Sequence, residues 1–151
     1  MAVFTITGAT GSVGRAIIQT LQSQSHEIRV LSTRKSVEIN GVSSFYWNPN
    51  TNEIDQDALI GSDYLIHLAG ATVSKRWTAA YKKQIMDSRV DGTQLLLSAM
   101  RRLKTPLKAV ISASAIGYYG SDLERLMEER DAPANDYLAA VTKTWESYTQ
   151  K

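Results

Sequence analysis

The sequence contains no cysteine and only two histidines. Without cysteine the chain has no disulfide, no thiolate nucleophile and no cysteine-ligated zinc. His26 and His67 lie far apart in the sequence and lack the spacing of a histidine metal site, so we expect no bound metal. The chain also lacks any apolar run near the roughly 18 residues of a membrane-spanning helix, and we expect no membrane insertion.

An excess of charge of one sign is missing as well. The 17 lysines and arginines face 15 aspartates and glutamates, and a net charge of +2 is too small to indicate nucleic acid or a membrane surface as a partner. With 43% hydrophobic and 21% charged residues, the composition is that of an ordinary globular protein. We expect residues 1–151 to form one domain, because this length suffices for a single hydrophobic core.

The first strand-like pattern begins at residue 2 or 3. This position leaves no space for a signal or transit peptide ahead of the strand. The lack of cysteine is compatible with a reducing compartment. We therefore expect a cytoplasmic protein.

One glycine-rich segment, VFTITGATGSVG at residues 3–14, stands out from this background. Gly8, Gly11 and Gly14 follow a β-branched strand pattern and precede an apolar helical pattern. In this context one glycine forms a tight turn, one lets the backbone approach a pyrophosphate, and one allows helix and strand to pack closely. The N-terminus of the helix offers free N–H groups to phosphates, and we expect Ser12 to cap that helix.

The segment predicts a dinucleotide-binding loop, and a glycine-rich turn without a ligand is the alternative. Arg15, directly after the third glycine, adds a positive charge for a phosphate. The candidate cofactor-binding residues of this segment are Gly8, Thr10, Gly11, Ser12, Val13, Gly14 and Arg15.

Strand and helix patterns alternate along the rest of the chain. Strands are predicted over residues 3–6, 27–33, 43–47, 63–68 and 107–112. Helices are predicted over 13–24, 54–60, 78–103 and from 135 onwards, with a kink or break at Gly92 and a loop over 117–133 that holds a turn at 123–129. This alternation predicts an α/β fold, a Rossmann-type doubly wound parallel sheet of about five strands.

Several motifs occur in the order typical of one enzyme superfamily. They are TGATGSVG (7–14), LAGA (68–71), SASAIGYYG (112–120) and a helix that begins near Tyr137. In these motifs the chain resembles short-chain dehydrogenases/reductases of the extended type. LAGATVSKRW (68–77), SRVDGT (88–93) and Trp145-Glu146 narrow the resemblance to the YfcH-like (SulA-like) epimerases, often described as nucleoside-diphosphate-sugar epimerases.

The resemblance implies a function. It implies an NADP(H)-binding domain of an epimerase or reductase that transfers a hydride at a carbinol carbon of a small-molecule substrate, with a nucleotide sugar as candidate. Proteins of that family are about twice this long, so it also implies that the chain corresponds to their N-terminal half and lacks the substrate-binding part. A non-catalytic NADP(H)-binding regulatory module is the alternative.

The end of the second predicted strand indicates which dinucleotide binds. NAD-specific domains carry an acidic residue there to hold the ribose 2′-hydroxyl. This chain has Ser32-Thr33-Arg34-Lys35 instead, which favours a 2′-phosphate and hence NADP over NAD. A solvated charge pair is the alternative. The further candidate cofactor-binding residues are Thr33 and Arg34 and, by the resemblance, Leu68, Ala69, Gly70 and Ser112.

The resemblance also implies two catalytic residues. Ser114 would orient the substrate oxygen, and Tyr137 would act as the acid/base. The lysine that normally follows such a tyrosine by four residues is Val141 here, and Lys143 lies about 120° around the helix. Without a nearby cation a phenol keeps a pKa of about 10 and is a poor base at neutral pH. A packing role for Tyr137 is therefore equally favoured.

Other motif residues allow less specific interpretations. Tyr118 and Tyr119 are alternatives for a position near the nicotinamide, with packing or substrate contact as the simpler use. For 76–77 and 88–89 the residue types alone indicate no chemistry, and an ion pair or a packing aromatic is the simpler interpretation.

Two apolar surfaces predict association. The strand over 107–112 is expected at the edge of the sheet, where its unpaired backbone groups can pair with another strand. The final helix carries an apolar stripe formed by Leu138, Val141, Trp145 and Tyr148. We therefore expect a homo-oligomer or association with a separate C-terminal half.

Overall fold

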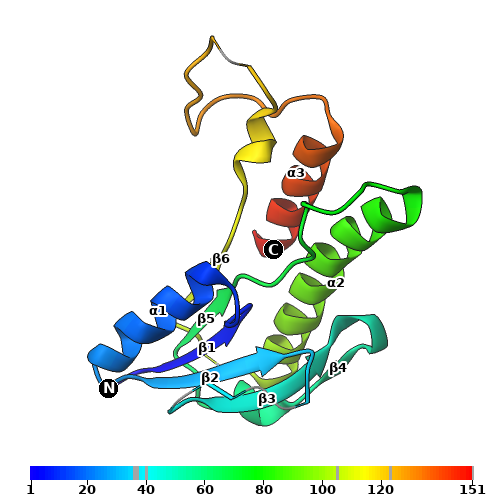
Figure 1. Cartoon of the computed structure of the whole chain (residues 1–151). Helices are drawn as coiled ribbons and strands as arrows, with labels where there is room; N and C mark the ends of the chain where they lie inside the picture. Colours follow the sequence, from blue (N-terminus) through cyan, green and yellow to red (C-terminus); the bar gives the residue numbers. More distant parts are fainter. Residues whose placement is uncertain (36–37, 40, 105, 123, 151) are drawn as a thin grey trace.

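The computed structural model describes residues 1–35, 38–39, 41–104, 106–122 and 124–150. Its centre is a six-stranded, mostly parallel sheet with the strand order β4-β3-β2-β1-β5-β6. The strands are β1 (Val3–Thr7), β2 (Glu27–Ser32), β3 (Ser43–Asn48), β4 (Glu53–Ile54), β5 (Tyr64–His67) and β6 (Ala109–Ser112). The α-helices are α1 (Ser12–Ser23), α2 (Ala79–Leu103) and α3 (Tyr137–Thr149). Figure 1 shows α1 on one side of the sheet and α2 with α3 on the other.

Neighbouring residues of a strand serve the two sides of the sheet in turn, as the pleat requires. In β2, Val30 belongs to the buried cluster that contains Ile18 of α1, whereas Leu31 belongs to the cluster that contains Leu96 of α2. Both faces of the sheet are therefore apolar, which explains the continuous hydrophobic runs in the sequence. The predicted Rossmann-type doubly wound fold is confirmed, and all five predicted strands are present.

The predicted helix over 54–60 is only partly confirmed, since the range holds the end of β4 and a 3₁₀ helix. Asn52 adopts a left-handed conformation with φ of 55° and reverses the chain, so that β4 pairs antiparallel with β3. A 3₁₀ helix, Gln56–Ala58, follows, and the Asp55 side chain accepts a hydrogen bond from the backbone N–H of Asp57. The left-handed Asn52 and the Asp55 side-chain hydrogen bond therefore limit this segment to a strand and a single 3₁₀ turn.

The predicted kink at Gly92 is also absent, because α2 continues through this residue. Gly92 is buried, and a Cβ placed on it would lie 3.3 Å from the Trp47 ring and 3.5 Å from the His67 ring. This glycine allows close packing rather than a break in the helix. The predicted cap is wrong as well, since Gly11 is the N-cap of α1 and no side chain caps this helix.

The segment before α3 is only partly as predicted. A short 3₁₀ helix, Ile116–Tyr119, occupies the start of the predicted loop. The predicted turn at 123–129 begins at Leu123, which lies outside the described residues. The final helix begins at Tyr137 rather than 135, because the Asp136 side chain accepts a hydrogen bond from the N–H of Ala139 and caps it.

The apolar stripe of α3 packs within the chain. Val141 and Trp145 are 2% and 4% exposed, because α3 lies against α2. The expectation that this stripe forms an intersubunit surface is therefore corrected. No helix within the described residues has the length and apolar character that crossing a membrane requires.

Strand β6 lies at the edge of the sheet and pairs with β5. Its Val110 and Ile111 side chains are 39% and 50% exposed. An edge of this kind combines exposed apolar side chains with unpaired N–H and C=O groups, which favours pairing with another strand.

We predict that two copies of this chain associate through the β6 edge. Sedimentation velocity at micromolar concentration should show a dimer that dissociates on dilution, and Ile111→Lys should shift the equilibrium toward monomer, because a charge opposes edge pairing. A single monomeric species of the parent chain over the whole concentration range would contradict this prediction.

Candidate functional site

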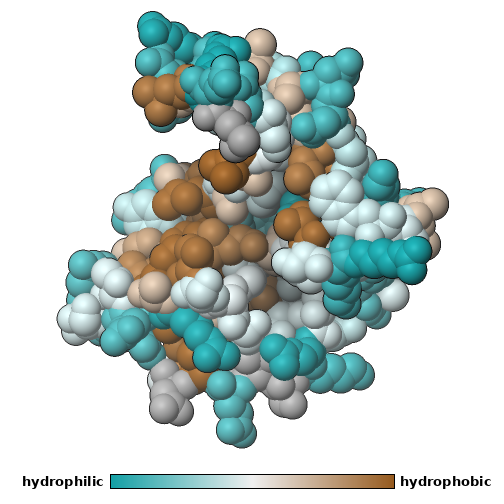
Figure 2. All heavy atoms as spheres, turned by 45° about the horizontal axis from the view of Figure 1, so that its top comes forward, coloured by the Kyte–Doolittle hydropathy of each residue, from teal (hydrophilic) through white to brown (hydrophobic). Residues whose placement is uncertain are grey.

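A cleft of about 650 Å³ lies at the carboxyl ends of the central strands. In parallel sheets of this kind, ligands bind outside the carboxyl ends of the strands, where the strand order reverses. Here the order reverses between β1 and β5, and residues that follow both strands line the cleft. Figure 2 shows a hollow in the face of the molecule, with hydrophobic and hydrophilic residues on opposite sides. The volume is within the range of ligand pockets, about 300–1,000 Å³.

The three glycines of the 8–14 loop have separate structural roles. Gly8 has φ of +73°, and a Cβ on it would lie 2.8 Å from the carbonyl carbon of Leu68. A Cβ on Gly14 would lie 2.4 Å from the carbonyl oxygen of Gly8. At Gly11 the nearest atom to an added Cβ is that same oxygen at 3.4 Å, an ordinary contact. Gly8 and Gly14 therefore allow close packing, while Gly11 keeps the cleft beside the N-terminus of α1 open.

Most of the predicted cofactor-binding residues line this cleft, and they come from the loops after β1, β2 and β5. They are Gly8, Thr10, Gly11, Thr33, Arg34, Leu68, Ala69 and Gly70.

Five predicted residues do not line the cleft. Ser12, Val13 and Gly14 lie in the first turn of α1, and Val13 is 60% exposed. The Arg15 guanidinium donates a hydrogen bond to the carbonyl oxygen of Thr10 at 3.1 Å, so it supports the loop from outside. Ser112 ends β6, where its hydroxyl donates to the carbonyl oxygen of Ala113. Their roles in binding stay predictions.

The sequence analysis missed the contribution of β3 and α2 to the cleft. Trp47 and the residues 48–50 line it from the end of β3, and Gln84 and Ser88 line it from α2. The contribution of residues 47–50 was predictable from the sequence, because the carboxyl ends of neighbouring parallel strands lie at the same edge of the sheet. On its own, the polar composition of 48–52 is typical of a turn. The α2 residues depend on a tertiary contact that the sequence pattern does not contain.

The cleft wall at 68–71 is held from β1. The Thr7 hydroxyl accepts hydrogen bonds from the backbone N–H groups of Leu68 and Ala69 at 3.1 and 3.2 Å. It also lies 2.7 Å from His67 Nδ1. Since both lone pairs of the hydroxyl are used, its proton is assigned to His67 Nδ1, which places the ring proton on Nε2. Burial lowers the pKa of His67 to about 4, and the Arg89 charge adds to this shift, so the ring is neutral at physiological pH.

The same wall is held from α2. The Ser88 hydroxyl accepts a hydrogen bond from the Ala71 N–H at 2.9 Å and donates to the carbonyl oxygen of Ile85. Arg89 Nη1 donates to the carbonyl oxygen of Ala71 at 3.2 Å. The residues 88–89, for which residue type alone indicated no chemistry, thus fix the position of one cleft wall.

The hydroxyls of the two predicted catalytic residues bond to different partners. The Ser114 hydroxyl donates to the Glu146 carboxylate, near the end of α3. The Tyr137 hydroxyl, at the start of α3, donates to the carbonyl oxygen of Lys82. With a rise of 1.5 Å per residue, Tyr137 and Glu146 lie about 13.5 Å apart along the axis of α3. Burial raises the pKa of the Tyr137 phenol, although the Arg89 charge acts in the opposite direction. Both catalytic roles stay predictions.

The fold and the cleft agree with a family assignment. The model of the NAD dependent epimerase/dehydratase family matches residues 4–148, and the chain belongs to this family. Epimerase family proteins from Mycobacterium leprae and Arabidopsis thaliana (the latter a chloroplastic SDR39U1 homolog) are 31% and 33% identical to it, over 98% and 97% of this chain. They are matched over 47% and 44% of their own length, so the chain spans about half the length of the curated relatives it matches.

Solved structures agree. A nucleoside-diphosphate sugar epimerase from Corynebacterium glutamicum is 33% identical with a TM-score of 0.78, covering 99% of this chain and 30% of that chain. The human epimerase family protein SDR39U1, solved with NADPH, has a TM-score of 0.75 at 24% identity, covering 97% of this chain and 48% of that chain. The similarity to the human protein shows the shared fold. The chain is therefore a nicotinamide-dinucleotide-binding Rossmann domain of the short-chain dehydrogenase type.

We predict that Gly11→Val abolishes dinucleotide binding and preserves the fold. A Cβ at this position would lie no closer than 3.4 Å to its nearest neighbour, the carbonyl oxygen of Gly8, and the valine methyl groups would occupy space that a pyrophosphate needs. Calorimetric titration with NADP⁺ measures binding, and thermal unfolding measures stability. If the variant binds NADP⁺ as tightly as the parent chain does, the phosphate site does not lie at this loop.

Proposed function

We propose that the cleft binds NADP(H) and that the chain is the cofactor domain of an epimerase or reductase acting on a small molecule, with a nucleotide sugar as the candidate substrate. The observation that carries this proposal is Arg34 at the cleft, in a lining that has no aspartate or glutamate among the described residues. The class of cofactor follows from the family, and the choice of NADP rests on this charge pattern.

The residues present fit a dinucleotide. Gly11 leaves open space at the N-terminus of α1, where unpaired N–H groups and the helix dipole favour phosphate oxygens. The lining continues from this loop to the ends of β2 and β3 on one side and β5 on the other. An extended ligand with a central pyrophosphate can therefore lie across the strand ends.

The end of β2 supports a 2′-phosphate. The Arg34 side chain is exposed in the cleft, and its backbone N–H donates to the Ser32 hydroxyl at 3.1 Å, which orders the turn. Guanidinium groups bind phosphate through paired hydrogen bonds. An acidic residue at this place would instead repel the phosphate and accept the ribose hydroxyl of NAD.

The chemistry we propose is hydride transfer at a carbinol carbon. A bound nicotinamide supplies the hydride acceptor or donor. Ser114, beyond the end of β6, would hold the substrate oxygen by a hydrogen bond. Because its hydroxyl donates to Glu146, its oxygen lone pairs stay available to accept a hydrogen bond from a carbinol O–H group.

A non-catalytic NADP(H)-binding module is the second candidate. It is favoured by the Tyr137 hydroxyl, which is bonded to a backbone carbonyl, and by Val141, which is buried where a lysine would activate that phenol.

Arg34→Ala should weaken NADP⁺ binding by about 1.5–3 kcal/mol, because a hydrogen bond to a charged group is lost, and should leave NAD⁺ binding nearly unchanged. Lys35→Ala is the matched control, since Lys35 lies over the Tyr46 ring and does not line the cleft. Calorimetry with both dinucleotides measures the difference. If Arg34→Ala weakens the binding of NADP⁺ and NAD⁺ equally, Arg34 does not bind the 2′-phosphate.

Ser114→Ala should remove turnover, whereas Tyr137→Phe should have a smaller effect, because the Tyr137 hydroxyl is bonded to the carbonyl oxygen of Lys82 and Val141 replaces the lysine that would activate it. Cofactor oxidation and reduction with a panel of sugar nucleotides measures turnover, and NADP⁺ binding controls for folding. Complete loss of turnover in Tyr137→Phe with the cofactor still bound would show that this phenol is the acid/base. The absence of turnover in the parent chain would favour the non-catalytic module.

A further inference from the structure

Glu146 carries a carboxylate that is bonded to the hydroxyl of a predicted catalytic residue. This carboxylate accepts a hydrogen bond from the Ser114 hydroxyl. Ser114 is exposed and Glu146 is partly exposed, and none of the ion pairs within the described residues includes Glu146. A cation beside a carboxylate favours its charged form and makes it a weaker proton acceptor. Glu146 is therefore available to take a proton, and Ser114 is a group that can deliver one.

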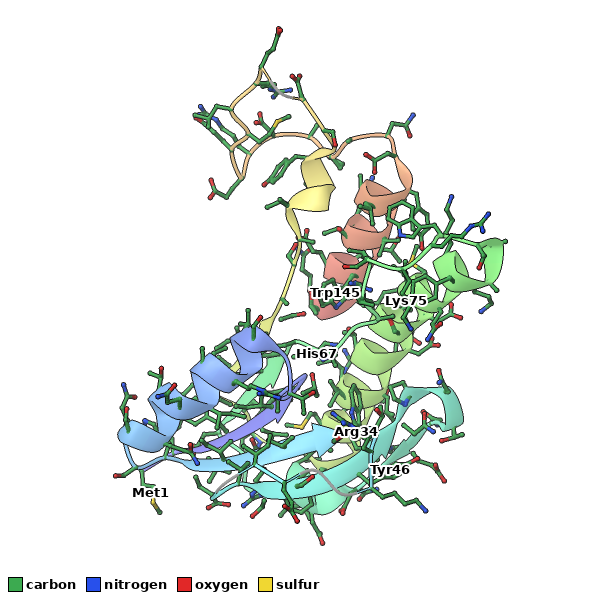
Figure 3. The ribbon with its side chains drawn as sticks, viewed as in Figure 1. Met1, Arg34, Tyr46, His67, Lys75 and Trp145 are labelled. Carbon is green, nitrogen blue, oxygen red and sulfur yellow. The ribbon has the colours of Figure 1, made fainter. Side chains whose placement is uncertain are left out.

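His67 holds the chain next to both partners of this pair. Its carbonyl oxygen accepts a hydrogen bond from the N–H of Ala113 at 2.9 Å, directly before Ser114. Its ring lies nearly perpendicular to the ring of Trp145, directly before Glu146, with 6.2 Å between the ring centroids. Figure 3 shows His67 and Trp145 next to one another, between the sheet and α3. The Ser114–Glu146 hydrogen bond therefore joins two segments that are each anchored on the same buried residue.

The pair belongs to the same edge of the sheet as the cleft. His67 is the last residue of β5, and residues 68–71, which follow it, line the cleft. Ser112, the last residue of β6, is the partner of His67 in the parallel ladder, so Ser114 follows the neighbouring strand at that edge. Ligands of parallel sheets bind outside the carboxyl ends of the strands. Ser114 therefore lies in the segment next to the one that forms a wall of the cleft.

The tyrosine that the family resemblance offers as the acid/base is poorly suited to take the proton. Its hydroxyl, that of Tyr137, donates to the carbonyl oxygen of Lys82, and Val141 occupies the position of the activating lysine. Burial raises the pKa of the Tyr137 phenol further above neutral pH, where a phenol is a poor base. Oxidation of a carbinol still requires an acceptor for its O–H proton, and carboxylates serve as general bases in many enzymes.

We propose that Glu146 is the proton acceptor for the oxidation of a carbinol held by Ser114, and that it acts through the Ser114 hydroxyl. The inference rests on the proposed function, in which a bound oxidised nicotinamide takes the hydride as the C–H bond breaks. The carbinol proton passes to Ser114 Oγ, and the Ser114 proton passes to the Glu146 carboxylate. The products are a carbonyl compound, the reduced dinucleotide and a neutral carboxyl group, which releases its proton to water.

The first test needs neither cofactor nor substrate. A base that takes the Ser114 proton makes the serine oxygen a better nucleophile, so Ser114 of the full chain should react with phenylmethylsulfonyl fluoride. Mass spectrometry of the digested protein identifies the modified residue and the rate of its modification. Ser147 is the internal reference and should stay unmodified, because its exposed hydroxyl donates to the carbonyl oxygen of Thr144, which is no base.

Three variants separate proton transfer from structure. Glu146→Gln should slow the modification of Ser114 about 10²-fold, because the amide accepts a hydrogen bond but takes no proton. Glu146→Ala should lose the modification and regain part of it on addition of formate, a rescue that a purely structural role would not show. Glu129→Gln is the matched control, which removes an exposed carboxylate elsewhere and should react as the parent does. Thermal unfolding reports the folding of each variant.

The second test measures turnover of the panel of sugar nucleotides with NADP⁺. Glu146→Gln should lower kcat about 10²-fold and leave KM and NADP⁺ affinity nearly unchanged, because only the proton transfer is lost. The inference is wrong if Ser114 of the parent chain stays unmodified, or if folded Glu146→Gln is modified as fast as the parent. Modification of Ser114 that depends on Glu146, without turnover in the parent, would support the proton transfer and contradict the proposed function alone.

Discussion

The close approach of the ends of β1 and β5 is the constraint on which the rest of the structure depends. Thr7 and His67 are direct partners in the parallel ladder, and the Thr7 hydroxyl holds the two backbone N–H groups that follow β5. Gly8 must then pass within van der Waals contact of Leu68, which leaves no space for a side chain. This contact sets the two walls of the cleft at the point where the strand order reverses.

Helix α2 packs against residues at the ends of β3 and β5. Gly92 lets the helix lie against Trp47 and His67, and the His67 ring is perpendicular to the rings of both Trp47 and Trp145. Trp145 thereby fixes α3 relative to the sheet, and Arg89 stacks on its ring while it bonds the cleft wall. Gly92 therefore lets α2 approach Trp47 and His67 closely, and the His67 ring in turn contacts Trp145 of α3.

Local sequence patterns predicted the parts of the fold that short-range chemistry controls. The glycine spacing at 8–14 and the apolar strands predicted the cleft and the doubly wound sheet, because these features depend on backbone sterics and on burial of both sheet faces. The strand β4 was missed since it depends on the left-handed Asn52 and on pairing with β3. The expected intersubunit stripe of α3 was wrong, because amphipathic spacing identifies a buried face without specifying what covers it.

The candidate site, like the fold, could be predicted from the sequence only in part. The glycine loop proposed to bind phosphate and the basic end of β2 follow from the sequence order of strand, glycines and helix. The partners of Ser114, Tyr137 and Arg89 do not, because each contact joins residues from different elements. A family resemblance predicts which residue types occur at the site. The partner to which each hydroxyl donates depends on tertiary packing.

The central claim is that this cleft binds a dinucleotide carrying a 2′-phosphate. Calorimetric titration of the unmodified chain with NADP⁺ and, separately, with NAD⁺ tests it most directly. We expect a single binding site for NADP⁺ and binding of NAD⁺ that is weaker by about tenfold or more, because NAD⁺ lacks one charge-assisted contact. Tighter binding of NAD⁺, or no binding of either dinucleotide, would contradict it.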